Sequence, residues 1–523
     1  MISAYTTATR SFTVRLDRRR RTSADRGGRY AGAILAAMLM VALISVGASF
    51  AVAFPLSILL GLTGQHFIAL AINPTKDVFG PVTFVAFYFT LCIGIRALYI
   101  VVLAPDAHRL GRIGYDDFLP QALWCAALAY ISFLIGFHLP LGNRLQSGAP
   151  RRELRWPKSV PVVGIALLSS LGFLAMVYGF RHGLGVVGNS RSEASEGVTG
   201  PLQLLFQLIS VGWVASCIFL FSRDRIRDKN AALPLVLLSL LCIAARIGIT
   251  GGKQALVEPL LEVLMVFHYL NKRLRFWQLA AVGLPAVLLA FGAINFYRFV
   301  IVRQGGAPRS FGDIVSLAST AYDRFTSGST AGQASALDQM MNRQAGVDAL
   351  ALVMKYTPNP QPFGHGDSFA RALLSVSVPR ALWPAKPIYS PSRDFEQNYM
   401  GMPGFFNGAS SPQLVADLYQ NFGLIGVTAG MLLLGAFFRW LYLFCILGVR
   451  SSSGVFLYAS LLPSLVHLME AVVGNMLIQF PRAVLVVICA GAFIGVRYSK
   501  VRWGSRRAFA SVATPKGSPV FQG

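Results

Sequence analysis

Charged side chains are scarce in this sequence. Only 13% of the 523 residues are Asp, Glu, Lys or Arg, whereas a soluble domain carries about 25%. Hydrophobic residues make up 54% of the chain, and apolar runs of about 20 residues, the length that crosses a bilayer, recur along it. These proportions exclude a soluble enzyme and predict an integral membrane protein.

Cysteine is also rare, and none of the six cysteines has metal-ligand spacing. All lie within apolar runs, where burial as a small hydrophobic side chain is the default expectation. The loops expected outside the membrane contain no cysteine, so no disulfide framework is available there. We therefore expect no metal site and no cofactor. The cysteines are Cys92, Cys125, Cys217, Cys242, Cys445 and Cys489.

Several other signatures are missing. The segment TGGKQ fails the P-loop pattern, because Ile247 stands where the first glycine should be and Gln254 follows Lys253. The first apolar run, from Tyr30, is too long for a signal peptide and follows a long basic segment. We find neither solenoid repeats nor the inverted repeat of many transporters.

What the chain does contain is a series of apolar runs that predicts an all-α polytopic membrane protein with about twelve transmembrane helices. About nine spans fall within residues 31–300 and about three within 413–497, between basic tails at 1–30 and 498–523. The expected spans are 31–54, 56–73, 80–103, 119–138, 160–180, 201–221, 232–250, 255–270, 278–300, 413–446, 454–472 and 480–497.

The formal charge of +25 would suit nucleic acid, but its distribution favours a membrane. Basic residues gather in both tails and in the short segments after the fourth, sixth and eighth expected spans, as the positive-inside rule predicts. Both termini are therefore expected in the cytoplasm, and the basic N-terminal tail is expected to meet anionic lipid headgroups. The segments after the spans contain Arg144, Arg151, Arg152, Arg155, Lys158, Arg223, Arg225, Arg227, Lys229, Lys272, Arg273 and Arg275.

Residues 301–412 then form one large outer loop, a length that is usually functional. Its charge is nearly balanced, which suits a folded, partly helical polar cap, and residues 313–325 and 332–343 have amphipathic helical character. Prolines 379, 384, 387 and 391 stiffen its C-terminal part. Rigid placement of Arg380, Lys386 and Arg393 there would suit a phosphate group, although a solvated surface is the alternative for any single arginine.

Three segments resemble the Wzy-type O-antigen polymerases, which join oligosaccharide repeat units. They are PRALWPAKP at 379–387, SPQLVADLYQNFGLIG at 411–426 and the hairpin TGGKQALVEPLLEVL at 250–264. Arg393 and Gly404 also match that family's spacing of an arginine, ten residues and a glycine. The loop at 181–200 departs from it, because Ser192 and Leu202 stand at the glycine positions after Arg181 and Arg191.

The resemblance implies a GT-C-like membrane glycosyltransferase at the periplasmic face of the bacterial inner membrane. Its donor and acceptor would be undecaprenyl-pyrophosphate-linked oligosaccharides, and a chain-length regulator protein is a candidate partner. The reaction needs cations for the pyrophosphate and a group that accepts the proton of the acceptor hydroxyl. The catalytic candidates are Arg380, Arg393, Lys386 and His365, and the substrate-binding candidates are Arg191, Lys253, Arg298, Arg482 and Asp417. A structural role is the alternative for His365.

Ionisable residues inside the expected spans need partners, since a lone charge in lipid is costly. Arg246 and Glu258 are about equally far from the glycine tip of the 232–270 hairpin, so we expect them to pair; contact with the lipid-linked substrate is the alternative. Arg96 has no partner nearby in the sequence. Glu262 and His268 are expected to be structural.

Two other functions compete with polymerisation. A flippase or transporter of lipid-linked glycan predicts charges along a membrane path and symmetry between halves, whereas this chain concentrates charge in one outer loop. An O-antigen ligase would share the layout and the leaving group, so sequence separates it from a polymerase only weakly.

The charge pattern predicts that both termini and residues 139–159 lie in the cytoplasm and that 301–412 lies outside. A reporter that is active only outside the cytoplasm should therefore work when fused near Gly366. Activity of the same reporter fused near Ser147 would overturn this orientation.

Overall fold

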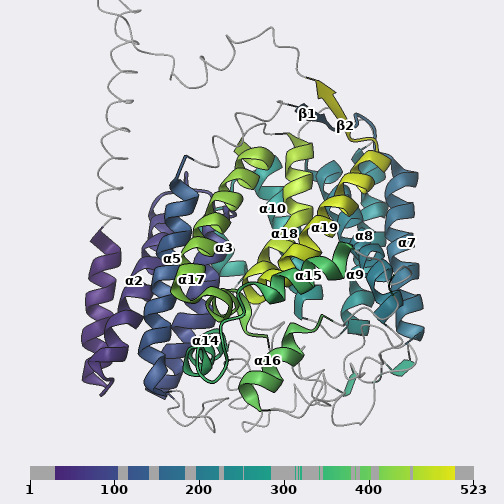
Figure 1. Cartoon of the computed structure of the whole chain (residues 1–523). Coiled ribbons are helices and arrows are strands. Elements are labelled where there is room, and N and C mark those ends of the chain that lie inside the picture. Colours follow the sequence, from purple (N-terminus) through teal and green to yellow (C-terminus); the bar gives the residue numbers. More distant parts are fainter. Residues whose placement is uncertain are drawn as a thin grey trace, which may run out of the picture.

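The structure is a bundle of long helices with one short two-stranded sheet (Figure 1). This computed structural model describes residues 30–103, 116–140, 152–182, 196–222, 229–250, 253–283, 312–313, 316, 319–320, 341, 345–377, 383, 389–401, 411–447 and 451–500. Within them, eight helices are long and apolar enough to cross a membrane. The chain is therefore an α-helical, membrane-embedded protein, as its composition predicts.

These eight helices are apolar on most sides, as lipid-facing helices must be. They are α2 (Phe50–Ile72), Pro81–Val102, α5 (Leu119–His138), α7 (Val162–Arg181), Leu204–Phe221 within α8 (Glu196–Phe221), Ala232–Ile249 within α9 (Ala232–Thr250), Gln413–Ile446 and α19 (Val473–Phe493). The second comprises α3 (Pro81–Tyr88), η1 (Phe89–Ile95), α4 (Arg96–Leu98) and η2 (Tyr99–Leu103), of which η1 and η2 are π-helical. The seventh comprises α17 (Gln413–Tyr442) and η7 (Leu443–Leu447).

The remaining elements are shorter or more polar. They are an apolar helix at Tyr30–Ser45, η4 (Asp116–Phe118), β1 (Arg152–Arg155), η6 (Lys229–Ala231), α10 (Lys253–Leu270), α14 (Gly346–Tyr356), α15 (Asp367–Ser377), α16 (Pro391–Met400), α18 (Ser452–Glu470) and β2 (Arg497–Lys500).

The helices follow the expected spans closely in the middle of the chain and depart from them near its ends. The expected span 119–138 coincides with α5. The break between the first two helices falls at residues 46–49 and not at Pro55, which lies inside α2. The last helix begins at Val473 and not at 480, and Gly474 and Ile478 in its first turns are buried. Of the expected span 278–300, the structure describes residues 278–283.

Two short strands accompany the helical bundle. β1 and β2 pair antiparallel, with Arg152 opposite Lys500 and Arg155 opposite Arg497. They lie at one end of the bundle, hereafter the sheet end, whereas α14 and α16 lie at the other, hereafter the loop end (Figure 1). Both strands belong to segments for which the charge pattern predicts the same side of the membrane.

A carboxylate ties three segments together near the sheet end. The hydroxyls of Tyr442 and Tyr269 both donate to Asp77 Oδ2, the latter at 2.7 Å, and His268 Nε2 lies 3.4 Å from Asp77 Oδ1. Burial alone would raise the pKa of Asp77, but these hydrogen bonds lower it below its usual value. His268 Nδ1 also accepts the Leu274 N–H at 2.9 Å, so His268 has the structural role expected of it.

Helix α14, which lies within residues 301–412, packs into the bundle. Its side chains Val347, Leu350 and Val353 are buried and belong to the same hydrophobic core as the membrane helices. The partner of Arg96 is on this helix: Arg96 Nε lies 2.9 Å from Asp348 Oδ2, and Arg96 Nη2 lies 3.1 Å from Asp348 Oδ1. Both side chains are 0% exposed.

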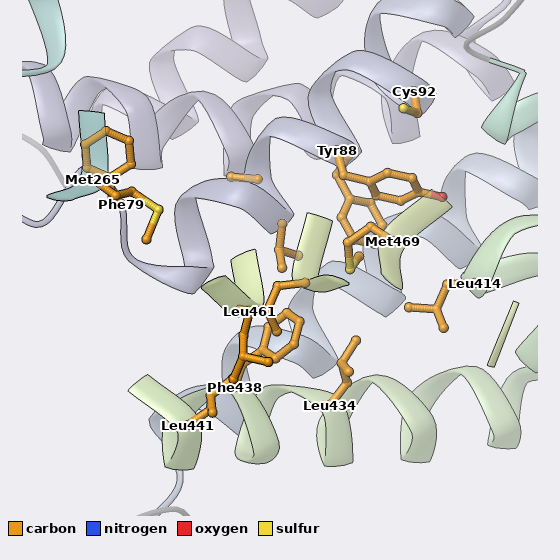
Figure 2. Close-up of a cluster of buried hydrophobic side chains, with 14 of the residues drawn as sticks. Phe79, Tyr88, Cys92, Met265, Leu414, Leu434, Phe438, Leu441, Leu461 and Met469 are labelled. Atoms are coloured by element: carbon orange, nitrogen blue, oxygen red, sulfur yellow. The ribbon is translucent and has the colours of Figure 1, made fainter. Parts of the chain in front are cut away.

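The core itself is continuous from the sheet end to the loop end. Figure 2 shows side chains of this core from α3, α10, α17 and α18. Helices α5 and α17 approach each other closely: a Cβ added at Gly136 would lie 2.0 Å from Leu432 O, and one at Gly435 would lie 2.2 Å from Phe133 O. Glycine permits this backbone approach, as in many membrane helix pairs.

Breaking the Arg96–Asp348 pair should destabilise the whole bundle, because a buried charge would lose its partner. We expect Asp348→Ala to cost about 3–5 kcal/mol and to lower the amount of folded protein in the membrane. Exchanging the two residues, Arg96→Asp with Asp348→Arg, should recover part of that loss. Abundance and thermal unfolding in detergent measure both effects, and normal values for Asp348→Ala would contradict the assignment.

Candidate functional site

The loop end contains a buried polar cluster built on a broken helix. Helix α17 is interrupted at Gly423, whose φ of 62° and ψ of −151° are not helical. The short segment before the break carries Asp417 and Asn421, both buried. Only glycine adopts such backbone angles readily, so the sequence itself separates this segment from the membrane-spanning part of α17.

Asn421 is the centre of this cluster. Its Nδ2 donates to the Asp417 backbone oxygen at 2.8 Å and to Asp417 Oδ1 at 3.2 Å. Its Oδ1 accepts from the Gly366 N–H and from Ser368 Oγ, each at 3.1 Å. One amide side chain therefore joins α17 to the turn that begins α15.

That turn holds His365 in a strained backbone conformation. The Gly364 N–H donates to Gln420 O at 3.1 Å, and the His365 N–H donates to Asn421 O at 3.0 Å. His365 has a φ of +46°, which is unusual for any residue but glycine. Its side chain is exposed, and its ring has no hydrogen-bond partner among the described residues. Strain of this kind persists where the surrounding structure enforces it, and it concentrates at functional sites.

Asp417 has a structural contact that the sequence did not predict. Its Oδ2 accepts the N–H of Val473 at 2.8 Å. Val473 is the first helical residue of α19. The α19 N-cap, Val472, has no side chain able to accept such a bond, so Asp417 caps the helix from α17 and complements its dipole. Asp417 is only 3% exposed, which assigns it to positioning rather than to direct contact with a large substrate.

Tyr389 completes the cluster beside this helix start. A Cβ added at Gly474 would lie 1.9 Å from the Tyr389 hydroxyl and 2.9 Å from the Ala372 Cβ. Tyr389 and α15 therefore both pack closely against the first turn of α19. The Tyr389 hydroxyl is buried with no hydrogen-bond partner among the described residues. Burial first, and then the charge of Asp417, raise the pKa of Tyr389, so its hydroxyl stays protonated at neutral pH.

The arginines of the loop end divide into paired and unpaired groups. Arg371 Nε lies 3.1 Å from Asp367 Oδ2, and Arg371 Nη1 lies 3.2 Å from Asp394 Oδ2, so this arginine links α15 to α16. Arg393 is exposed on α16, and Arg482 is partly buried in α19, about 13 Å along the helix from Val473. Neither has a carboxylate partner among the described residues.

Arg482 lies further from the start of its helix than the expected spans place it. The last expected span begins at 480, two residues before Arg482. Since α19 begins at Val473, Arg482 lies well inside a membrane-spanning helix, where an unpaired cation is costly and frequently functional.

Several candidates fall outside the described residues, and others were missed. The structure does not describe Arg191, Arg298, Arg380 or Lys386, and it describes only the backbone of Lys253, the first residue of α10. Sequence analysis did not single out Asn421, Tyr389 or Arg371. For Asn421 a signal existed, because it follows Asp417 by four residues and therefore shares its helix face.

The expected hairpin pair is confirmed. Arg246 Nη2 lies 3.1 Å from Glu258 Oε2, joining α9 to α10 within the bundle. The Arg246 side chain is 23% exposed and that of Glu258 is 9% exposed, so most of the pair is covered by the protein.

A family model described as a domain of unknown function (DUF8712) matches residues 184–445, half of the chain. The match begins before α8 and ends within η7, so it contains the hairpin, helices α14 to α16 and all of α17. No curated protein matches the chain, and no solved structure matches it.

Removing the Asn421 side chain should release the turn at 364–368 without unfolding the bundle. Asn421→Ala deletes four hydrogen bonds, and at about 0.5–1.5 kcal/mol each we expect a local loss of about 2–6 kcal/mol. Amide hydrogen exchange at Gly366 and neighbouring residues should accelerate. Asn398→Ala, at an exposed position on α16, is the matched control; equal protection in both variants would show that Asn421 does not hold the turn.

Proposed function

We propose that this chain, which belongs to the family described as a domain of unknown function (DUF8712), is a glycosyltransferase that polymerises undecaprenyl-pyrophosphate-linked oligosaccharide repeat units. The product is a surface polysaccharide, either O-antigen or exopolysaccharide. In this proposal about twelve spans cross the bacterial inner membrane, and the loop end faces the periplasm, following the positive-inside pattern.

The observation that carries the proposal is the exposed, strained turn at His365, fixed by Asn421 to the broken start of a membrane helix. A lipid-linked sugar keeps its prenyl chain in the bilayer and its pyrophosphate at the headgroup level. A reacting group for such a substrate must be held rigidly where a membrane helix ends. His365 meets that requirement, and the resemblance of residues 411–426 to the polymerases points to the same segment.

The chemistry assigns roles to the exposed and unpaired groups. The acceptor sugar hydroxyl attacks the anomeric carbon of the donor, and the bond from that carbon to the pyrophosphate oxygen breaks. His365 takes the hydroxyl proton, and the lipid pyrophosphate leaves with the bonding electrons. Arg393, together with Arg380 and Lys386, stabilises the charge that develops on the leaving group. Asp417 and Asn421 position the turn and the start of α19.

A transporter of lipid-linked glycan is the second candidate, favoured by one observation. Helix α10 places Glu258, Glu262 and His268 along a single helix of the bundle, and all three are buried. Ionisable residues in series within a membrane protein mark proton or ion pathways in many transporters. This series would supply the intramembrane path of charge that a transporter needs.

Deleting the gene and separating the surface glycan by gel electrophoresis tests the proposal. A polymerase deletion should leave single repeat units, whereas loss of all outer-face glycan would favour the transporter, and polymer that stays on its lipid carrier would favour a ligase. In the complemented strain, His365→Ala or Arg393→Ala should lower polymer formation on the order of 100- to 1000-fold at normal protein level. Arg393→Lys should rescue poorly, because an ammonium lacks the guanidinium fork.

The matched control is Arg275→Ala, which removes an exposed arginine from the sheet end. It should leave the chain-length distribution unchanged. If the His365 and Arg393 variants are present at normal level and also give the wild-type distribution, this active-site assignment is wrong.

A further inference from the structure

Helix α10 carries two carboxyl groups one turn apart in the bundle, Glu258 and Glu262. α10 packs against α8, α9 and α18, and Glu262 is 0% exposed. A carboxylate in such a place needs a counter-charge or a proton, because an isolated ionised group in an apolar environment is strongly disfavoured.

One cation faces these two acids among the described residues. Arg246 of α9 is paired with Glu258, at 3.1 Å. Glu258 and Arg246 both lie within electrostatic range of Glu262, yet Glu262 forms no ion pair in the part of the chain that the structure describes. The arginine thus neutralises the first acid and leaves the second without a counter-charge.

The contacts of Glu262 fit a protonated carboxylic acid. Glu262 Oε1 accepts the hydroxyl of Ser210 from α8, as the carbonyl oxygen of an acid does. Glu262 Oε2 is buried and has no hydrogen-bond partner among the described residues. Cys217 of α8 also lies within electrostatic range of Glu262. The hydroxyl of Tyr458, on α18, donates to Phe79 O and not to Glu262.

Helix α10 is also weakened between the two acids. Pro259 lies inside the helix directly after Glu258, and its ring nitrogen cannot donate to the carbonyl four residues earlier. The Pro259 carbonyl accepts the Trp213 indole N–H from α8 at 3.0 Å. A helix that lacks this backbone hydrogen bond can bend here, and so shift against α9, more easily than an unbroken helix.

We propose that Glu262 is a proton-binding site and that release of its proton transfers Arg246 from Glu258 to Glu262. The proton passes from the carboxylic acid to water, and the carboxylate then attracts Arg246. The new partner is one helical turn away, about 6 Å along α10. This exchange would couple protonation of Glu262 to the packing of α9 against α10. It does not depend on the proposed glycosyl transfer.

Infrared spectroscopy of the full chain in phospholipid nanodiscs tests the proposal. At neutral pH, wild-type protein should show the carbonyl band of a buried protonated carboxylic acid, and Glu262→Gln should lose that band while unfolding at the wild-type temperature. Glu258→Gln should also lose the band, because Arg246 then pairs with an ionised Glu262. The double variant leaves Arg246 without either acid and should accumulate at least about 10-fold less folded protein.

The matched control is Glu470→Gln, an exposed acid on α18, which should keep the band. A band that persists in Glu262→Gln, or that is absent from the wild type, overturns the proposal. So does a band that persists in Glu258→Gln, since Arg246 would then not have changed partner. A band that responds to sodium at constant pH, and not to protons at constant sodium, would identify a metal-cation site instead.

Discussion

The ion pair between Arg96 and Asp348 constrains most of the architecture. An arginine in the middle of a membrane helix must be neutralised within the bundle, and the acid that does so belongs to the segment between the two groups of spans. That requirement draws α14 into the core. A Cβ at Gly346 would lie 2.6 Å from Gln413 Oε1 at the start of α17, and Thr357, just after α14, bonds to Tyr399 of α16 at 2.8 Å. The position of the loop-end cluster therefore depends on this pair.

Polar side chains at three places in the bundle join different helices. Asp77 links the turn after α2 to α10 and α17 near the sheet end. Arg246 and Glu258 join the hairpin, and Asp417 caps α19 at the loop end. In hydrocarbon such groups must find partners within the protein, so they specify which helices meet. The region matched by the family ends before α19, so the loop-end cluster also uses a helix outside that region, through the bond from the Val473 N–H to Asp417.

At the candidate site, tertiary contacts change which of the predicted residues are buried and which are exposed. Asp417 was a substrate-binding candidate, but its oxygens are already occupied by Val473 and Asn421. His365, for which a structural role was the alternative, is exposed on a strained backbone. Arg371 looked like any other loop arginine, yet two carboxylates hold it. Residue type and spacing identified the chemistry that is available, whereas burial decided which groups a substrate can reach.

The sequence by itself determined the membrane class, most helix positions and the Arg246–Glu258 pair. Each of these follows from local patterns: apolar runs set helix lengths, and a tight hairpin brings together residues only 12 positions apart. Only the tertiary structure decided that Arg96 meets Asp348, 252 positions away, and that β1 pairs with β2. It also decided that a carboxylate of α17 caps α19. The physical reason is that hydropathy and helical periodicity describe one segment at a time, whereas the partner of a buried charge depends on which helices pack together.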